Sequence, residues 1–350
     1  RRGFQQAYRV FRCRCLEVEE DEMKTTRQGS GWGRIFAAVI GVVALASPAV
    51  AQLNVEDLVS FTRPIGVDVY RDKVVVVRYC PQEVILIDGE GNQERVAEDL
   101  PDTGGCVEMY VAVSPGLGGF AKDHIFVTQS SKIYEIAPEE GFAVSLFANV
   151  SGLSGGAGIK FDTTGAFDND MILTGTNGRV FRMNAQGEAT QLANIGTVIE
   201  NPDIAPLDWG PLGGTIVVPS ESTGRVYSVS AEGVVTTLAT GIPAAEAANF
   251  IPTEICDLGE GLGAWFGALY SVKIVQIPAA DFTGMEGQLL VTSESANGLY
   301  LIRWDGQNYT VEHLQNVSGG SFEGSNWAHC FCDDPDNDGY GVGNTCEGPD

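Results

Sequence analysis

Alternating acidic residues near the C-terminus have the spacing of a calcium-binding loop. The stretch reads Asp334-x-Asp336-x-Asp338-Gly339, and Asn344 offers a further oxygen. Ca²⁺ takes about six to eight oxygen ligands, and Asp side chains that alternate along a tight loop converge on one point. No Glu stands at the twelfth position, so the loop departs from an EF-hand. The alternative to a calcium site is an acidic linker.

The N-terminal part has the three features of a signal peptide. In residues 23–51, basic Lys24 and Arg27 precede an apolar run over 35–46 that is too short to span a bilayer, and Ala49 and Ala51 offer a cleavage site. The alternative is a membrane anchor or a buried helix. We predict that residues 1–22, upstream of the first Met, are read-through and that the mature chain starts at Gln52 without a transmembrane segment. The protein is then secreted, periplasmic or at the cell surface.

The cysteine count fits export. Six follow the leader, and an even number in an exported protein favours disulfides. None has the C-x-x-C spacing of a zinc or redox site. Six cysteines allow many connectivities, and the pairing that we prefer is Cys80–Cys106, Cys256–Cys330 and Cys332–Cys346.

The charge of the chain excludes one class of partner. Asp and Glu number 46 against 21 Lys and Arg, which gives a formal net charge of −25. So acidic a protein repels phosphate backbones, and we therefore expect no nucleic-acid partner. The composition suits cation binding, although most of these carboxylates are expected to form an ordinary solvated surface.

These residues are positioned by short strands. Segments of β-branched residues bounded by Gly, Asn, Asp, Ser or Pro recur through the mature chain, without a long amphipathic helical pattern. They also repeat: residues 178–187 and 224–233 align 46 residues apart, with further copies near Val84, Ser131 and Asn297. A unit of about 40–50 residues with four short strands is typical of a β-propeller blade.

The repeats predict an all-β propeller with six blades, the alternatives being five or seven. Five blades fill residues 65–317, with an insertion around Trp265. A sixth would be closed by residues 53–62 pairing with residues 318–329. The propeller then covers residues 52–331, and the calcium-loop tail covers residues 332–350.

The Gly-Arg-Val-Phe/Tyr stretches and the phrase Phe161-Asp162-Thr163-Thr164-Gly165-Ala166-Phe167 resemble the six-bladed propellers of the gluconolactonase, strictosidine-synthase-like and NHL superfamily. This resemblance implies the fold, which serves many functions. The segment at 332–350 resembles a thrombospondin type 3 repeat or the related metal-binding repeat of bacterial surface proteins. We expect that more repeats or a surface-anchoring tail follow it.

Four acidic residues near blade starts are candidates for the channel wall. They are Asp68, Glu108, Asp203 and Glu254. Gluconolactonase-like enzymes hold a divalent cation in the channel, but their local motifs are not found at these positions. The alternative is ordinary capping of blade turns.

Two functions follow. The first is an exported module that binds a small molecule, glycan or protein and carries a Ca²⁺-binding C-terminal repeat. The second is a metal-dependent lactonase-like or esterase-like hydrolase with a cation in the channel, and no catalytic residue is assigned to it. Convergence of the four channel carboxylates on one point would favour the enzyme, and their dispersal would favour the binding module.

Overall fold

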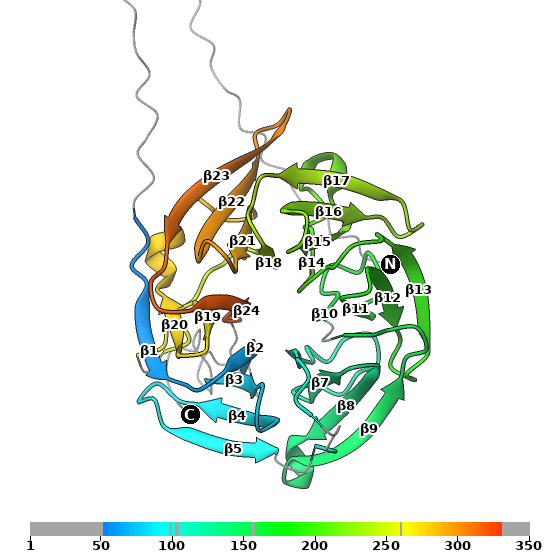
Figure 1. Ribbon diagram of the computed structural model, residues 1–350, viewed down its shortest axis with the longest axis vertical. Coiled ribbons are helices and arrows are strands. Elements are labelled where there is room, and N and C mark those ends of the chain that lie inside the picture. The colour runs from blue at the N-terminus through cyan, green and yellow to red at the C-terminus, as the bar shows by residue number, and fades with distance from the viewer. Residues whose placement is uncertain (1–51, 98–99, 102–104, 156–157, 260, 331–350) are drawn as a thin grey trace, which may run out of the picture. The chain divides into compact units, whose positions relative to one another are not determined.

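The described residues form a ring of six antiparallel sheets, each with four strands (Figure 1). The structure, a computed structural model, describes residues 52–97, 100–101, 105–155, 158–259 and 261–330. The predicted all-β propeller and its six blades are confirmed. In these residues helix is confined to three short 3₁₀ segments, η1 (Pro138–Glu140), η2 (Gly210–Leu212) and η3 (Ala279–Phe282). No helix in the described part is long and apolar enough to cross a membrane.

Blades 1 to 4 each use four consecutive strands, ordered from the axis outward. Blade 1 contains β2 (Pro64–Tyr70), β3 (Lys73–Arg78), β4 (Glu83–Ile87) and β5 (Gln93–Ala97). Blade 2 contains β6 (Val111–Val113), β7 (Ile125–Gln129), β8 (Lys132–Ala137) and β9 (Ala143–Asn149). Blade 3 contains β10 (Ile159–Phe161), β11 (Met171–Thr174), β12 (Arg179–Met183) and β13 (Ala189–Asn194). Blade 4 contains β14 (Asp203–Ile204), β15 (Ile216–Ser220), β16 (Arg225–Val229) and β17 (Val235–Thr240).

Blades 5 and 6 are interlaced in sequence. Blade 5 contains β18 (Ala245–Phe250), β21 (Leu289–Ser293), β22 (Gly298–Trp304) and β23 (Tyr309–Asn316). Between β18 and β21 the chain leaves to form the hairpin of β19 (Trp265–Tyr270) and β20 (Lys273–Ile277). This hairpin forms the middle of blade 6, with β24 (Ser321–Trp327) at the axis and β1 (Glu56–Ser60) at the outer edge.

The predicted pairing of the two terminal segments is therefore wrong in detail. Both segments belong to blade 6, but β1 pairs with β20 and β24 pairs with β19. The stretch around Trp265 is not an insertion outside the blades, because Trp265 and Phe266 are fully buried within blade 6. Repeat spacing missed this arrangement because the hairpin interrupts the blade-5 repeat instead of extending it.

The sequence repeat corresponds to the third strand of each blade. The copies at Val180 and Val226 are followed by a shift of register against the fourth strand, just before Phe181 and Tyr227. The same shift occurs in blades 1, 2 and 5. A bulge of this kind increases the local twist, which suits the outer part of a propeller blade.

Apolar packing between neighbouring blades holds the ring together. Phe126 of blade 2 and Phe161 of blade 3 stack edge to face with ring centroids 5.5 Å apart, and Trp209 and Phe250 do so at 4.8 Å between blades 4 and 5. One blade alone would leave both of its faces in water, so this burial is the main driving force for closing the ring.

Two of the three predicted disulfides are present. Cys80 is bonded to Cys106 and Cys256 is bonded to Cys330, with Cα–Cα separations of 5.6 and 5.4 Å. The third predicted pair, Cys332–Cys346, lies outside the described residues, as do the calcium loop and the signal peptide.

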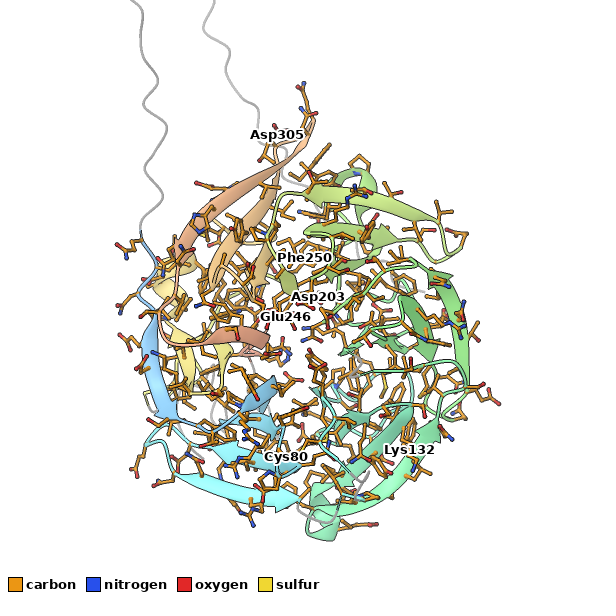
Figure 2. The ribbon with its side chains drawn as sticks, viewed as in Figure 1. Cys80, Lys132, Asp203, Glu246, Phe250 and Asp305 are labelled. Atoms are coloured by element: carbon orange, nitrogen blue, oxygen red, sulfur yellow. A yellow bond between two sulfur atoms is a disulfide. The ribbon has the colours of Figure 1, made fainter. Side chains whose placement is uncertain are left out.

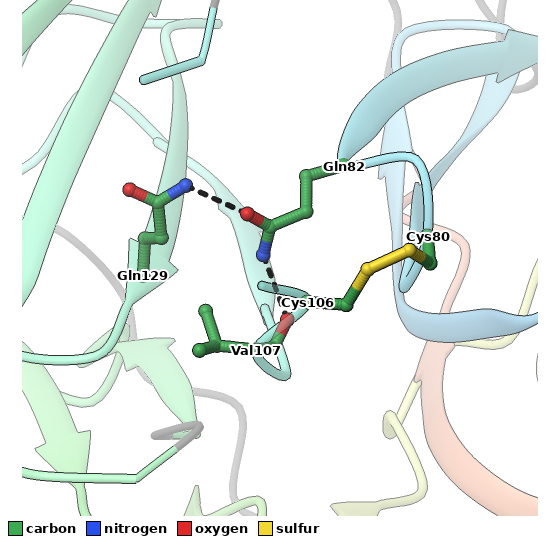
Figure 3. The surroundings of a disulfide bond; sticks show 5 residues. All are labelled: Cys80, Gln82, Cys106, Val107 and Gln129. Atoms are coloured by element: carbon green, nitrogen blue, oxygen red, sulfur yellow. Dashed lines mark hydrogen bonds between the residues drawn. A yellow bond between two sulfur atoms is a disulfide. The ribbon is translucent and has the colours of Figure 1, made fainter. Parts of the chain in front are cut away.

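The first disulfide ties blade 1 to the segment that enters blade 2 (Figure 3). Beside it, Gln82 Nε2 donates to the carbonyl oxygen of Val107 at 2.8 Å, and Gln129 Nε2 donates to Gln82 Oε1 at 3.0 Å (Figure 3). This segment carries Glu108, and the disulfide and the Gln82 hydrogen bond both hold it to blade 1.

Candidate ligand-binding site at the propeller axis

One position of the innermost strand is equivalent in all six blades. In each blade, the residue at this position pairs with the corresponding residue of the second strand. In blade order, the six residues are Asp68, Ala112, Lys160, Asp203, Asn249 and Asn326. All but Ala112 are polar, so the axis of the ring is polar at this level. Figure 2 shows Asp203 close to this axis.

Asp68 and Asp203 play the same structural role in different blades. One oxygen of Asp68 accepts from the N–H of Val69 at 2.8 Å, and the other accepts from the N–H of Val113 in the next blade at 2.7 Å. Asp203 repeats this pattern with its own neighbour Ile204 and with Phe250 of the next blade. Each carboxylate therefore joins two adjacent innermost strands.

Lys160 connects this level across the axis. Its Nζ donates to Asn326 Oδ1 at 2.8 Å and lies 3.7 Å from Asp203 Oδ1, while Asn326 Nδ2 donates to Asp68 Oδ1 at 2.7 Å. Blades 3 and 6 lie opposite each other in the ring, so the Lys160–Asn326 bond spans it (Figure 1). We call Asp68, Lys160, Asp203 and Asn326 the lysine network.

Burial raises the pKa of Asp68 and of Asp203, and the nearby Lys160 ammonium opposes this rise in both. The charged groups of the lysine network are thus partnered by each other or by backbone N–H groups. This satisfied arrangement explains how carboxylates are tolerated at the centre of the fold.

A second polar level lies three residues earlier in the chain, on β18 and β24 and just before β14. Glu200, Glu246 and Glu323 precede Asp203, Asn249 and Asn326, respectively, by three positions. At about 3.3 Å per residue, this places them roughly 10 Å along the axis from the lysine network. Figure 2 shows Glu246 near the axis as well.

Three more glutamates lie close enough to raise, through electrostatic repulsion, the pKa values of glutamates at this level. They are Glu108 before β6, and Glu221 and Glu294 in the turns that follow β15 and β21. We call Glu108, Glu200, Glu221, Glu246, Glu294 and Glu323 the glutamate cluster; its members come from blades 2, 4, 5 and 6. Exposure increases across it: Glu200 and Glu246 are buried, Glu108, Glu294 and Glu323 are half-buried, and Glu221 is exposed.

The buried members of the cluster have few partners. Glu246, which is 3% exposed, accepts one hydrogen bond from the Tyr110 hydroxyl at 3.1 Å. Glu200 is 5% exposed, and its carboxylate makes no hydrogen bond or ion pair with any described residue. The Glu200 oxygens are not among the fully buried side-chain atoms that lack a partner, so this carboxylate faces accessible space instead of a protein group, and the cluster therefore differs in kind from the lysine network.

The electrostatics of the cluster are those of mutual repulsion. Burial, and then repulsion from Glu108 and Glu221, raises the pKa of Glu200 to about 9. Burial and repulsion from Glu294 raise the pKa of Glu323 to about 8, and burial together with the Glu221 carboxyl raises that of Glu294 to about 7. Burial and then Glu200 raise the pKa of Glu246 well above its usual range. The cluster thus retains protons near neutral pH.

The four predicted channel carboxylates separate into three places. Asp68 and Asp203 join the lysine network, and Glu108 joins the glutamate cluster. Glu254 lies beside the second disulfide, where its backbone oxygen is 3.5 Å from the sulfur of Cys330. In the described part of the chain, the four predicted carboxylates do not meet at one point. Such dispersal was the result expected to favour the binding module over the enzyme.

Sequence reasoning missed five of the six cluster members. A signal was present: Glu200-x-x-Asp203 recurs as Glu246-x-x-Asn249 and as Glu323-x-x-Asn326, one copy in each of three consecutive blades. A second signal is the Ser-Glu-Ser triplet that contains Glu221 in blade 4 and recurs around Glu294 in blade 5.

Among the described residues, the one group of three His, Cys, Asp or Glu ligand atoms within 4.8 Å of one another is Glu254, Cys256 and Cys330. The two cysteines of that group are joined in a disulfide, so their sulfurs are not thiolate ligands. In the described part of the chain, the glutamate cluster has no preformed three-ligand site, and a cation would bind its carboxyl oxygens in place of the protons that they retain.

No protein-family model matches this sequence, and no curated protein matches it. Many solved structures do share its fold. A chain of a nidogen/laminin complex aligns with TM-score 0.52 and 13% identity, over 76% of this chain and 84% of that chain. Regucalcin from Agrobacterium tumefaciens, described as a calcium-binding protein, aligns with TM-score 0.50 and 14% identity, over 78% of this chain and 81% of that one.

A virginiamycin B lyase from Staphylococcus aureus aligns with TM-score 0.49 and 15% identity, over 78% of this chain and 92% of that one. At such identities the likeness is one of fold. The class that the fold and site define is a six-bladed β-propeller with a polar axis, a fold that serves many functions.

Proposed function

We propose that this chain is an exported binding module whose ligand brings positive charge to the glutamate cluster. The observation that carries the proposal is Glu200, a buried carboxylate without a hydrogen-bond or ion-pair partner among the described residues and surrounded by other carboxylates. A cationic group placed there would supply the missing partner.

The lysine network provides the contrast. Three residues after Glu200 in the chain, Asp203 is buried and accepts hydrogen bonds from backbone N–H groups beside the Lys160 ammonium, and Asp68 has the same role in blade 1. The fold can therefore pair buried carboxylates where their role is structural. The Glu200 carboxylate, left unpaired among the described residues one level away, is better explained by a ligand than by packing.

Export is supported by the two disulfides, because such bonds persist in oxidising surroundings. Together with the predicted signal peptide, they support our proposal that the protein lies outside the cytoplasm, either secreted, periplasmic or at the cell surface. The proposed Ca²⁺ loop at Asp334–Asp338 and the resemblance to a thrombospondin type 3 repeat suit attachment of the propeller to a surface.

The proposal is tested by thermal shift with cationic probes at constant ionic strength. We expect the melting temperature of the full chain to rise with CaCl₂ or with organic amine salts, and the Glu200→Gln/Glu246→Gln double variant to lose most of this rise. Glu140→Gln, an exposed glutamate at η1, is the matched control and should respond as the wild type does. An Asp336→Asn/Asp338→Asn background removes the C-terminal loop's own response. If no cationic probe stabilises the protein, the proposal fails.

The alternative function is a metal-dependent lactonase-like or esterase-like hydrolase. One observation favours it: the pKa of Glu294, near 7, suits a general base at neutral pH. The test is hydrolysis of a panel of lactones and aryl esters with and without EDTA. Activity that needs a metal and is lost in Glu294→Gln would establish the enzyme in place of the binding module.

A further inference from the structure

We propose that the ligand of the glutamate cluster is a linear organic polycation with two or more ammonium groups, rather than a single metal ion. This inference rests on the proposed function, since it names the ligand class of that same site. It is carried by the dispersal of the six carboxylates and by the exposure gradient across them.

A single metal ion needs closely spaced oxygens. Calcium–oxygen distances are about 2.3–2.6 Å, so any two oxygens on one ion lie within about 5 Å of each other. Within the described residues, no three carboxylate, imidazole or sulfur ligand atoms of the cluster come within 4.8 Å of one another. A metal ion would therefore contact three of these glutamates only after the side chains had moved together against their mutual repulsion.

Dispersed charge suits a ligand whose charges are also dispersed. Each ammonium group donates short, charge-assisted hydrogen bonds to one or two carboxylates, and the methylene spacers separate successive groups by several ångströms. The cluster runs from buried Glu200 and Glu246 through half-buried Glu294 to exposed Glu221. This gradient matches a chain that enters end first from the solvent.

The structure also limits how far such a ligand could enter. Roughly 10 Å further along the strands, the Lys160 ammonium spans the axis to Asn326 and would repel a second cation. Before that level, Tyr110 holds one oxygen of Glu246 in place through the 3.1 Å hydrogen bond. The leading ammonium is therefore expected to stop between Glu200 and Glu246.

The test is calorimetric titration of the full chain with spermidine, putrescine, n-propylamine and CaCl₂ at constant ionic strength, in the Asp336→Asn/Asp338→Asn background. We expect affinity to fall in the order spermidine, putrescine, propylamine, with spermidine binding at least about tenfold more tightly than Ca²⁺. Glu200→Gln/Glu246→Gln should weaken spermidine by at least about tenfold, and Glu140→Gln should not.

The outcomes separate the inference from the function on which it rests. If Ca²⁺ binds as tightly as spermidine and loses affinity in the double variant, the site does bind cations but the proposed ligand class is wrong. If spermidine binds equally to wild type and double variant, the binding is general adsorption to an acidic surface and the inference fails. If no probe binds, both proposals fail.

Discussion

At the scale of single residues, the environment decides what a carboxylate does. Asp203 and Glu200 stand three positions apart, and both are buried. Asp203 accepts two backbone hydrogen bonds and faces Lys160, whereas Glu200 faces other glutamates. Both residues are acidic, so residue type alone could not show from the sequence that Asp203 serves the structure and that Glu200 is available to a ligand.

Removing the Lys160 charge should destabilise the fold. In Lys160→Met, the side chains of Asp68 and Asp203 lose their nearest cation while remaining buried, so we expect a loss of about 3–5 kcal/mol in the free energy of unfolding. Lys132→Met, at an exposed position on β8, is the control and should change stability by less than about 0.5 kcal/mol. Urea denaturation measures both. A Lys160→Met protein as stable as the wild type would show that the lysine network is not structural.

The glutamate cluster should make stability fall as pH rises. Its carboxyls have folded-state pKa values raised to about 9, 8 and 7, well above the unfolded value of about 4.3. Such groups contribute stability that is fully present below the unfolded pKa and is lost as pH rises through the folded pKa. We therefore expect the melting temperature to decrease between pH 6 and pH 9.5.

Calorimetry of the Glu200→Gln/Glu323→Gln variant provides the comparison, because amides cannot ionise. Its melting temperature should vary less over the same pH range. His124, whose pKa is raised by hydrogen bonds to Glu135 and Glu139 against the effect of its burial, also loses stabilisation as pH rises, but it remains in both proteins and cancels in the difference. If the melting temperatures of the two proteins varied identically with pH, the raised pKa values of Glu200 and Glu323 would be contradicted.

At the scale of elements, the closing strand β24 connects the disulfide, the lysine network and the glutamate cluster. It carries Glu323, Ser325 and Asn326, and the Cys256–Cys330 bond follows shortly after its end. Ser325 donates to Asn249 Oδ1 and accepts, at its backbone oxygen, from Asn249 Nδ2 at 3.0 Å. The strand is therefore fixed by polar contacts on the axis and by a covalent bond beyond it.

Loss of the second disulfide should loosen β24 selectively. We expect Cys256→Ser/Cys330→Ser to lower stability by about 2–4 kcal/mol and to speed amide exchange in β24. Cys80→Ser/Cys106→Ser should instead affect exchange near Glu108 and leave β24 unchanged. Hydrogen-exchange mass spectrometry distinguishes the two. Equal protection of β24 in all three proteins would show that the disulfide does not hold the closing strand.

The strands of blades 1 to 5 were largely predictable because each is a short β-branched run between turn residues, and the same pattern recurs near Val84, Val180 and Val226. The arrangement of blade 6 was not predictable, because its strands come from three separate parts of the chain. The glutamate cluster was also hidden for a physical reason: its members become neighbours only when blades 2, 4, 5 and 6 are placed around one axis.

At the scale of the whole molecule, two parts of the chain are expected to respond differently to calcium. We expect Ca²⁺ to protect the segment at Asp334–Asp338 from proteolysis, because three carboxylates on a short loop repel one another until a cation neutralises them. Asp336→Asn/Asp338→Asn should abolish this protection and leave the main melting transition in place, since apolar burial between blades stabilises the propeller. Limited proteolysis with and without EDTA measures this calcium-dependent protection in the wild type and in the variant. A tail fully protected in EDTA would contradict the calcium loop.

The central claim is that the glutamate cluster receives positive charge from a ligand, and a crystal structure of the full chain grown with spermidine tests it most directly. The account predicts a ligand nitrogen within about 3 Å of the carboxylates of Glu200 and Glu246, with further nitrogens directed toward Glu294 and Glu221. Spermidine bound elsewhere on the acidic surface, with Glu200 and Glu246 contacting water alone, would contradict it.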